Sequence, residues 1–174
     1  MIKYKISVLC KRQTRGRRTN MTKHETTINL ELYKVKAKSY YHDKWLNGFF
    51  SNFVLGGLEI IDEKAMHCKI DENTLCRNTG KKIPDMHGKR VYLYENDVCK
   101  MTWQDDCDNE KNFEYVFIRY DEDLCGFVAV GERGDQIDLN GFGDNDVEGI
   151  YECIVGNVFD NADLLSGKQK EKLK

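Results

Sequence analysis

Short hydrophobic runs recur at intervals of about ten residues along the C-terminal half of the chain, separated by turns rich in Gly, Asp and Asn. In residues 113–120, Phe113, Tyr115 and Phe117 alternate with the intervening positions, and a period of two is typical of a strand. The pattern predicts strands within residues 90–103 (broken at residues 95–97), 113–120, 124–130, 136–139 and 149–159. Regular spacing of this kind favours a small barrel or a sandwich.

The N-terminal half carries fewer strand signals. Residues 33–38 alternate strictly, which predicts a strand with one face in water. Residues 44–61 predict an irregular hairpin or a short strand. Three shorter predictions follow from the same pattern: a strand at residues 1–8, another at 65–70, and a turn or helical turn at 71–74. Residues 10–29 are polar and basic without a period, so we expect them to be flexible.

Turn and cap residues add detail. Asp85 and Gly88 predict a tight turn, because aspartate bonds its own backbone and glycine accepts a positive φ. Asp160 or Asn161 is expected to cap a short helix that ends near Gly167, leaving a lysine-rich tail at residues 167–174. Gly156 predicts a β-bulge or a close backbone approach rather than a phosphate cradle.

Composition places the chain among soluble globular proteins, with 40% hydrophobic and 32% charged residues over 174 positions. No segment approaches the ~20 apolar residues of a membrane span, and the start lacks the apolar segment of a signal peptide. We therefore expect a protein of the bacterial cytoplasm without a membrane partner. Met21 offers a second start, so residues 1–20 are either a basic arm or a misread upstream segment.

Charge is distributed unevenly. The net charge is −2, yet residues 1–20 carry seven basic and no acidic residues, and residues 95–163 carry nineteen acidic and four basic ones. A split of this kind points to partners rather than to a fold. The candidate interaction residues are acidic: Asp105, Asp106, Asp108, Asp121, Glu122, Asp123, Asp144 and Asp146. The candidate contacts to nucleic acid are basic: Lys11, Arg12, Arg15, Arg17 and Arg18.

Catalytic and metal-binding patterns are weak. The seven cysteines include no Cys-x-x-Cys pair, and the four histidines share no ligand spacing, so we expect reduced, buried thiols and no metal or other cofactor. Residues 144–149 resemble the opening of a calcium loop, but the twelfth position is Val155 instead of glutamate. No catalytic residue is predicted, and the protein is not expected to be an enzyme.

Two motifs carry a family resemblance. The first joins Thr79-Gly80 to residues 87–92 and to Tyr94-Glu95-Asn96-Asp97-Val98, and the second spans residues 154–165. In this order they resemble the YopX family of phage and prophage proteins, over roughly residues 32–165. The family strand that lies near its start corresponds to residues 33–38 here, so this chain departs from the pattern by an N-terminal extension. The family has no established activity.

The expected fold is mainly β (α+β), an SH3-like small barrel with an N-terminal β segment and a short C-terminal helix. We expect a basic, flexible extension at residues 1–30, a YopX-like β domain at 31–166 and a tail at 167–174. The leading hypothesis is a non-catalytic phage or prophage accessory protein that binds an unknown protein partner, or a second copy of itself, through an acidic face. The alternative is a nucleic-acid-associated protein that uses the basic arm.

Overall fold

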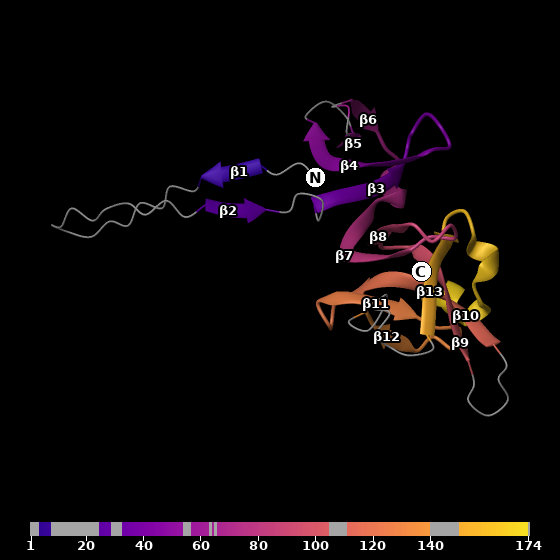
Figure 1. The fold of residues 1–174 in the computed structure, drawn as a ribbon. Helices are drawn as coiled ribbons and strands as arrows, with labels where there is room; N and C mark the ends of the chain where they lie inside the picture. Colours follow the sequence, from indigo (N-terminus) through magenta and orange to yellow (C-terminus); the bar gives the residue numbers. More distant parts are fainter. Residues whose placement is uncertain are drawn as a thin grey trace. The chain divides into compact units, whose positions relative to one another are not determined.

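The structure is a computed structural model that describes residues 4–7, 25–28, 33–53, 57–62, 64, 66–104, 111–139 and 150–173. It comprises two units, Met1–Tyr33 and Lys34–Lys174. Strands make up most of the described residues, which confirms the mainly β prediction (Figure 1). Within the described ranges, no helix has the length and apolar character needed to cross a membrane.

The N-terminal unit contains one antiparallel strand pair. β1 (Tyr4–Ser7) lies opposite β2 (Glu25–Ile28). β1 falls within the strand predicted for residues 1–8. β2 corrects the prediction that residues 10–29 lack regular structure, because three of its four residues are β-branched and favour a strand even where the run is too short to show a period.

The second unit begins with a six-stranded antiparallel sheet in the order β6-β5-β4-β3-β7-β8 (Figure 1). Its strands are β3 (Lys34–Lys38), β4 (Trp45–Phe53), β5 (Gly57–Ile61), β6 (His67–Lys69), β7 (Cys76–Pro84) and β8 (Arg90–Tyr94). A 3-10 helix, η2 (Glu72–Thr74), precedes β7 and is capped by Asp71, as predicted for residues 71–74.

The hairpin β4–β5 is more regular than predicted. Phe49 to Phe53 pair in unbroken register with Ile61 to Gly57. Gly48 permits this close pairing, because a Cβ built there would lie 2.1 Å from the Ile61 carbonyl oxygen. Gly48 is therefore a packing requirement of the sheet.

A five-stranded sheet follows in the order β12-β11-β10-β9-β13. Its strands are β9 (Asp97–Gln104), β10 (Lys111–Asp121), β11 (Gly126–Val130), β12 (Gln136–Asp138) and β13 (Ile150–Asn157), and all of them correspond to predicted strands. The two sheets are joined by a parallel bridge between Asp85 and Ile154. Both strand orders are those of open sheets, so the described pairings do not include the closure that an SH3-like barrel requires.

Both faces of the five-stranded sheet are buried. On one face Ile83 and Leu93 of the β7–β8 hairpin pack against Val116 and Ile118 of β10. On the other face Phe117 packs in a cluster with five further buried side chains: Val98, Val128, Val130, Val158 and Leu165. A strand covered on both sides reads as a continuous apolar run, which explains why the alternation fades after residue 115.

The C-terminal segment covers the second of these faces and corrects the predicted helix and tail. A 3-10 helix, η4 (Ala162–Leu164), precedes helix α1 (Gly167–Lys172). The α-helix therefore begins at Gly167, the residue near which the predicted helix ends. Ser166 and Gln169 form a capping box. Gln169 is fully buried, and its Nε2 donates hydrogen bonds to the carbonyl oxygens of Tyr115 (2.8 Å) and Val130 (2.9 Å). The predicted lysine-rich tail is therefore docked on the sheet.

Candidate functional site

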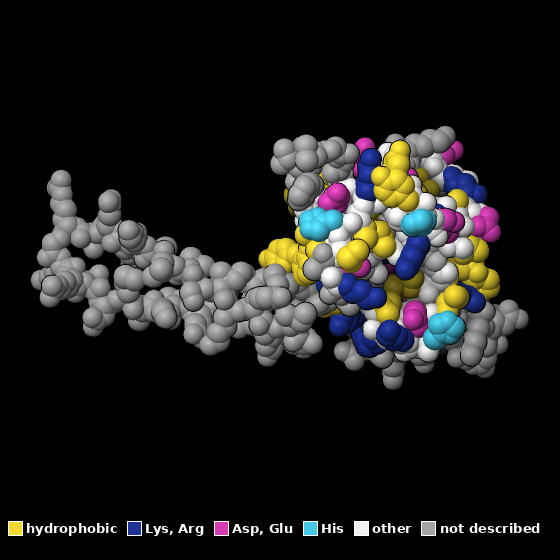
Figure 2. Space-filling model, turned by 90° about the horizontal axis from the view of Figure 1, so that it is seen from above, with side chains coloured by type: hydrophobic (Ala, Val, Ile, Leu, Met, Phe, Trp, Pro, Cys, Tyr) yellow, Lys and Arg dark blue, Asp and Glu magenta, His cyan; other side chains and the backbone are white. Residues whose placement is uncertain are grey.

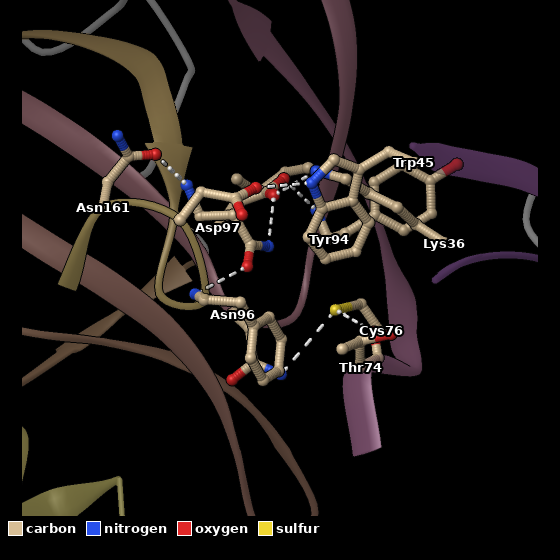
Figure 3. A network of polar contacts seen from close by, with 12 residues as sticks. Lys36, Trp45, Thr74, Cys76, Tyr94, Asn96, Asp97 and Asn161 are labelled. Carbon is tan, nitrogen blue, oxygen red and sulfur yellow. Dashed lines mark hydrogen bonds and ion pairs between the residues drawn. The ribbon is translucent and has the colours of Figure 1, made fainter. Parts of the chain in front are cut away.

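The two motifs of the resemblance meet at one buried carboxylate, Asp97 (Figure 3). Asp97 opens β9 and is 1% exposed. It accepts hydrogen bonds from Lys36 Nζ (2.7 Å) on β3, from the Tyr94 backbone N–H (2.9 Å) and from Asn157 Nδ2 (3.4 Å) at the end of β13. The carboxylate thus links the first motif, the second motif and the six-stranded sheet.

The backbone around Asp97 is shaped by two special positions. Asn96 has a φ of 66°, which asparagine tolerates better than most residues. Its N–H donates to the Ile118 carbonyl (2.7 Å), and its carbonyl accepts from the Val158 N–H (2.9 Å). Gly156 lies at the register shift in β13, where a Cβ would lie 2.0 Å from Asn161 Oδ1. The predicted bulge at Gly156 is confirmed.

Burial raises the pKa of Asp97 above its ordinary value, although Lys36, the Tyr94 N–H and Asn157 each lower it. Each oxygen of this carboxylate accepts a hydrogen bond. A buried, fully bonded ion pair at a junction between sheets has a structural explanation, so this network holds the motifs together and offers no free group for chemistry.

Cys76 lies at the edge of the same network. Its thiol donates to the Thr74 carbonyl (3.2 Å), and Asn96 Nδ2 lies 3.7 Å from the sulfur. Burial raises the pKa of Cys76 to about 11, so the thiol stays protonated at neutral pH. Because the thiolate is the nucleophilic form, Cys76 is an inert core residue.

The lysines of β3 are held by partners, which corrects the prediction that one face of this strand lies in water. Lys36 and Lys38 both lie over the Trp45 ring, at 4.8 and 5.7 Å from its centroid. Lys38 also pairs with Asp43 and with Asp160, and Trp45 Nε1 donates to Asp160 Oδ2 (2.6 Å). Burial alone would raise the pKa of Asp160, but the bonds from Lys38 and Trp45 lower it. These charges serve the packing of the unit.

The predicted acidic candidates divide into three groups. Asp121 is 6% exposed and accepts hydrogen bonds from the Leu124 N–H, the Asp123 N–H and Gln136 Nε2, which lower its pKa. It caps the β10–β11 turn, so its carboxylate is committed to hydrogen bonds within the sheet. Glu122 and Asp123 are exposed at that turn. The remaining candidates lie outside the described residues: Asp105, Asp106, Asp108, Asp144 and Asp146, together with Lys11, Arg12, Arg15, Arg17 and Arg18.

A second group of acids, not predicted, lies where the β11–β12 turn approaches β10. Glu132 and Asp135 are exposed there, and the Glu132 N–H lies 3.4 Å from Glu114 Oε2. Burial raises the pKa of Glu114, and the charges of Asp135 and Glu132 raise it further. Glu114 lies eighteen residues before Glu132 in the sequence. Strand pairing brings it to the turn that holds Glu132 and Asp135.

A shallow pocket of about 370 Å³ lies beside the loop between β3 and β4. Its lining includes Tyr40 and Tyr41, which are 60% and 70% exposed and pack edge to face. Lys69 lies 4.4 Å from the centroid of the Tyr40 ring. The other side chains that line the pocket are polar, and they include His42, Asp43 and Asp71.

Among the described residues, no group of three His, Cys, Asp or Glu side chains could hold a metal ion. Comparison with models of protein families, with curated proteins and with solved structures gives no match. The candidate surfaces are therefore assessed by their own chemistry, and four exposed carboxylates lie at two turns of the five-stranded sheet: Glu122, Asp123, Glu132 and Asp135.

Proposed function

We propose that the protein is a non-catalytic binding module that docks a basic protein partner on the acidic turns of its five-stranded sheet. The observation that carries this proposal is the exposure of four carboxylates beside β10–β12: Glu122, Asp123, Glu132 and Asp135. Within the described part of the chain, none of the four forms an ion pair. Arg133 is the basic residue of the β11–β12 turn, so the carboxylates remain in excess there. An excess of exposed charge attracts a complementary surface and steers its approach.

The frame beneath these carboxylates supports the same proposal. The centre of β10 is buried on both faces, and Asp121 fixes the β10–β11 turn by accepting hydrogen bonds from the Asp123 and Leu124 N–H groups. The β11–β12 turn is tied to the C-terminal segment, because Ser166 Oγ donates to the Glu132 carbonyl (2.8 Å). A surface presented by fixed turns loses little conformational freedom on binding.

The test is capture of partners from a bacterial host during phage induction, with two matched variants of the full chain. E132Q/D135N removes two charges from the acidic surface. E72Q/D163N removes two exposed acids elsewhere. We expect the first variant to lose a specific, salt-sensitive partner that the second retains. Equal recovery with both variants would contradict the acidic docking surface.

We further propose that the chain is a divergent member of the YopX family, encoded by a phage or prophage and acting in the cytoplasm of the bacterial host, with a fold related to SH3-like barrels. The meeting of the two motifs at Asp97 supports this, because residues of both motifs are needed to satisfy one buried group. The basic arm remains the alternative route to a partner, through nucleic acid.

A further inference from the structure

The pocket beside the loop between β3 and β4 shares no residue with the acidic turns of the five-stranded sheet. Its lining comes from two segments, residues 38–43 and Asp71. Its volume of about 370 Å³ lies at the lower end of the range of small-molecule sites, which is ~300–1,000 Å³. A hollow of this size takes a small ligand or one unit of a longer chain.

Backbone hydrogen bonds hold the two lining segments together. The Tyr40 N–H donates to the Lys69 carbonyl, and the Asp71 N–H donates to the Lys38 carbonyl, both at 2.9 Å. Asp71 also caps η2, so its side chain has a fixed position. The pocket is therefore formed by the fold itself, and a ligand would order few side chains on binding.

Tyr40 and Tyr41 give the pocket an aromatic surface. They are 60% and 70% exposed, and their ring centroids lie 5.3 Å apart with an angle of 82° between the ring planes. Lys69 Nζ lies 4.4 Å from the centroid of the Tyr40 ring and covers one of its faces. Among the described residues, Tyr40 is the ring partner of Tyr41 and no cation lies over the Tyr41 ring, so Tyr41 keeps an open face. An open aromatic face packs well against a flat apolar group.

The polar side chains of the pocket retain unused hydrogen-bonding atoms. Asp43 is 89% exposed and pairs with Lys38 through Oδ1 (3.0 Å). Asp71 Oδ1 accepts from the backbone N–H and from Nδ2 of Asn73 (3.1 and 3.0 Å). Within the described ranges, Oδ2 of each carboxylate has no hydrogen-bond partner, and neither has the exposed ring of His42. The pocket thus offers acceptors at its carboxylates, and a donor and an acceptor at a neutral imidazole.

The charges around the two rings cancel. Lys38 and Lys69 bring two positive charges, and Asp43 and Asp71 bring two negative ones. The face drawn in Figure 2 likewise shows hydrophobic side chains among basic, acidic and histidine side chains. An ion is attracted by an excess of the opposite charge, which these four residues do not provide. The pocket therefore suits a neutral ligand that carries several polar groups.

We infer that the pocket binds a neutral sugar ring. A pyranose ring has an apolar C–H face and several hydroxyl groups, each of which both donates and accepts hydrogen bonds. The C–H face fits the open face of Tyr41, and the hydroxyls match the unused atoms of Asp43, Asp71 and His42. No residue of the acidic turns is involved, so sugar binding goes beyond the proposed docking function and does not rest on it.

The experiment uses the full chain and saturation-transfer difference NMR. The probes are glucose, galactose, mannose and N-acetylglucosamine, and the disaccharides cellobiose, lactose and chitobiose. Each is titrated to about 20 mM, because a small ligand with few contacts binds in the millimolar range. We expect at least one probe to bind, with the strongest saturation on the C–H protons of one ring face. A disaccharide bound more tightly than its monosaccharide would identify a glycan chain as the source of the ring, and equal affinity would identify a free sugar.

Four variants locate the binding site. Y41A should weaken binding by about fivefold or more, because it removes the aromatic surface. D43A should weaken binding by about threefold or more, because it removes an acceptor and only an exposed ion pair. F113A, at an exposed aromatic residue of β10, and D163A, at an exposed acid before the C-terminal helix, are the matched controls and should stay within about twofold of the wild type. E132Q/D135N should bind sugar like the wild type, so failure of the acidic docking and failure of sugar binding are distinguishable.

Two charged probes test the alternative ligands. N-acetyl-arginine amide and inorganic phosphate at about 20 mM should not displace the bound sugar. Binding of either ion that Y41A or D43A abolishes, without binding of any sugar, would assign the pocket to an ion and overturn the inference. Failure of every sugar probe to bind the wild type, or equal affinity of Y41A and the wild type, would also refute it.

Discussion

Replacement of Lys36 by methionine isolates the buried ion pair at the junction of the two motifs. Methionine keeps the apolar stem of lysine and removes its charge and its hydrogen-bond donors. In the wild type, Lys36 Nζ lies 2.7 Å from Asp97 Oδ1, and the two side chains are 18% and 1% exposed. The variant therefore leaves a buried carboxylate with two remaining donors, the Tyr94 N–H and Asn157 Nδ2.

The magnitude follows from opposing terms. At an effective dielectric constant of about 20, two unit charges at the 2.7 Å separation attract by about 6 kcal/mol before desolvation is subtracted. Removing one partner of a buried pair typically costs about 3–5 kcal/mol, because the other charge stays buried. Lys36 is partly exposed, so we expect about 3 kcal/mol at neutral pH. Loss of the contact to the Trp45 ring is included in this figure.

The pH dependence separates a charge effect from a packing effect. Burial already raises the pKa of Asp97, and the loss of Lys36 raises it further. A carboxyl group whose pKa rises on folding contributes stability at low pH and loses it as the pH rises through the folded-state pKa. The deficit of the variant should therefore be largest well above the folded-state pKa of Asp97 and should shrink as the pH falls and Asp97 takes up a proton.

Urea denaturation followed by tryptophan fluorescence at about pH 5 and about pH 8 measures both effects. K38M is the matched control, because Lys38 lies on the same strand and pairs with Asp43 (89% exposed) and Asp160 (38% exposed). It should cost less than about 1 kcal/mol. K36M/D97N should be more stable than the sum of the single variants implies. A K36M loss equal to that of K38M, or one that does not change with pH, would refute the buried-pair interpretation.

Three further predictions concern the turn, the helix and the acidic surface. G88V should lower stability by about 1–2 kcal/mol, because Gly88 has a φ of 77°, whereas G167A, at a helical position with open space, should leave the melting temperature unchanged or raise it. Q169L should lower the free energy of unfolding by about 3 kcal/mol, because the Tyr115 and Val130 carbonyls and the Ser166 N–H lose their partner. K168Q is the control. A melting temperature of Q169L like that of the wild type would show that α1 does not stabilise the sheet. Raising sodium chloride from ~0.01 to ~0.1 M shortens the Debye length from ~30 to ~10 Å and should raise the melting temperature by relieving repulsion among Glu114, Glu132 and Asp135; a flat or falling value would argue against the crowding.

Local chemistry made much of the strand layout predictable. The turn at Gly88, the break at residues 95–97 and the bulge at Gly156 depend on backbone preferences of Gly, Asn and Asp, which the sequence displays directly. The five-stranded sheet was predictable for the same reason, because each of its strands is a hydrophobic run between such turns.

Features set by distant contacts were not predictable in this way. Lys36 and Lys38 look like the solvated face of a strand until the structure brings Asp97 and Asp160 to them. The segment after Gly167 has the composition of a solvated tail, and only the hydrogen bonds of Gln169 to two carbonyls on neighbouring strands explain its helix. Asp121 lies in a run with the composition of an acidic surface, and although its bonds to the Asp123 and Leu124 N–H groups are a local turn pattern, its bond from Gln136 Nε2 depends on the pairing of distant strands.

The charge that the folded protein presents to a partner therefore differs from the charge that its sequence suggests, and this bears on the proposed docking surface. The β3 lysines and Asp97, Asp121 and Asp160 are committed to contacts within the unit, so they contribute little to long-range attraction. At the β10–β12 turns the accessible charge of the described residues is mostly negative, with Glu122, Asp123, Glu132 and Asp135 beside a single exposed Arg133. Salt would weaken the docking of a basic partner there, and the comparison of E132Q/D135N with E72Q/D163N separates a contribution of these carboxylates from a general effect of charge.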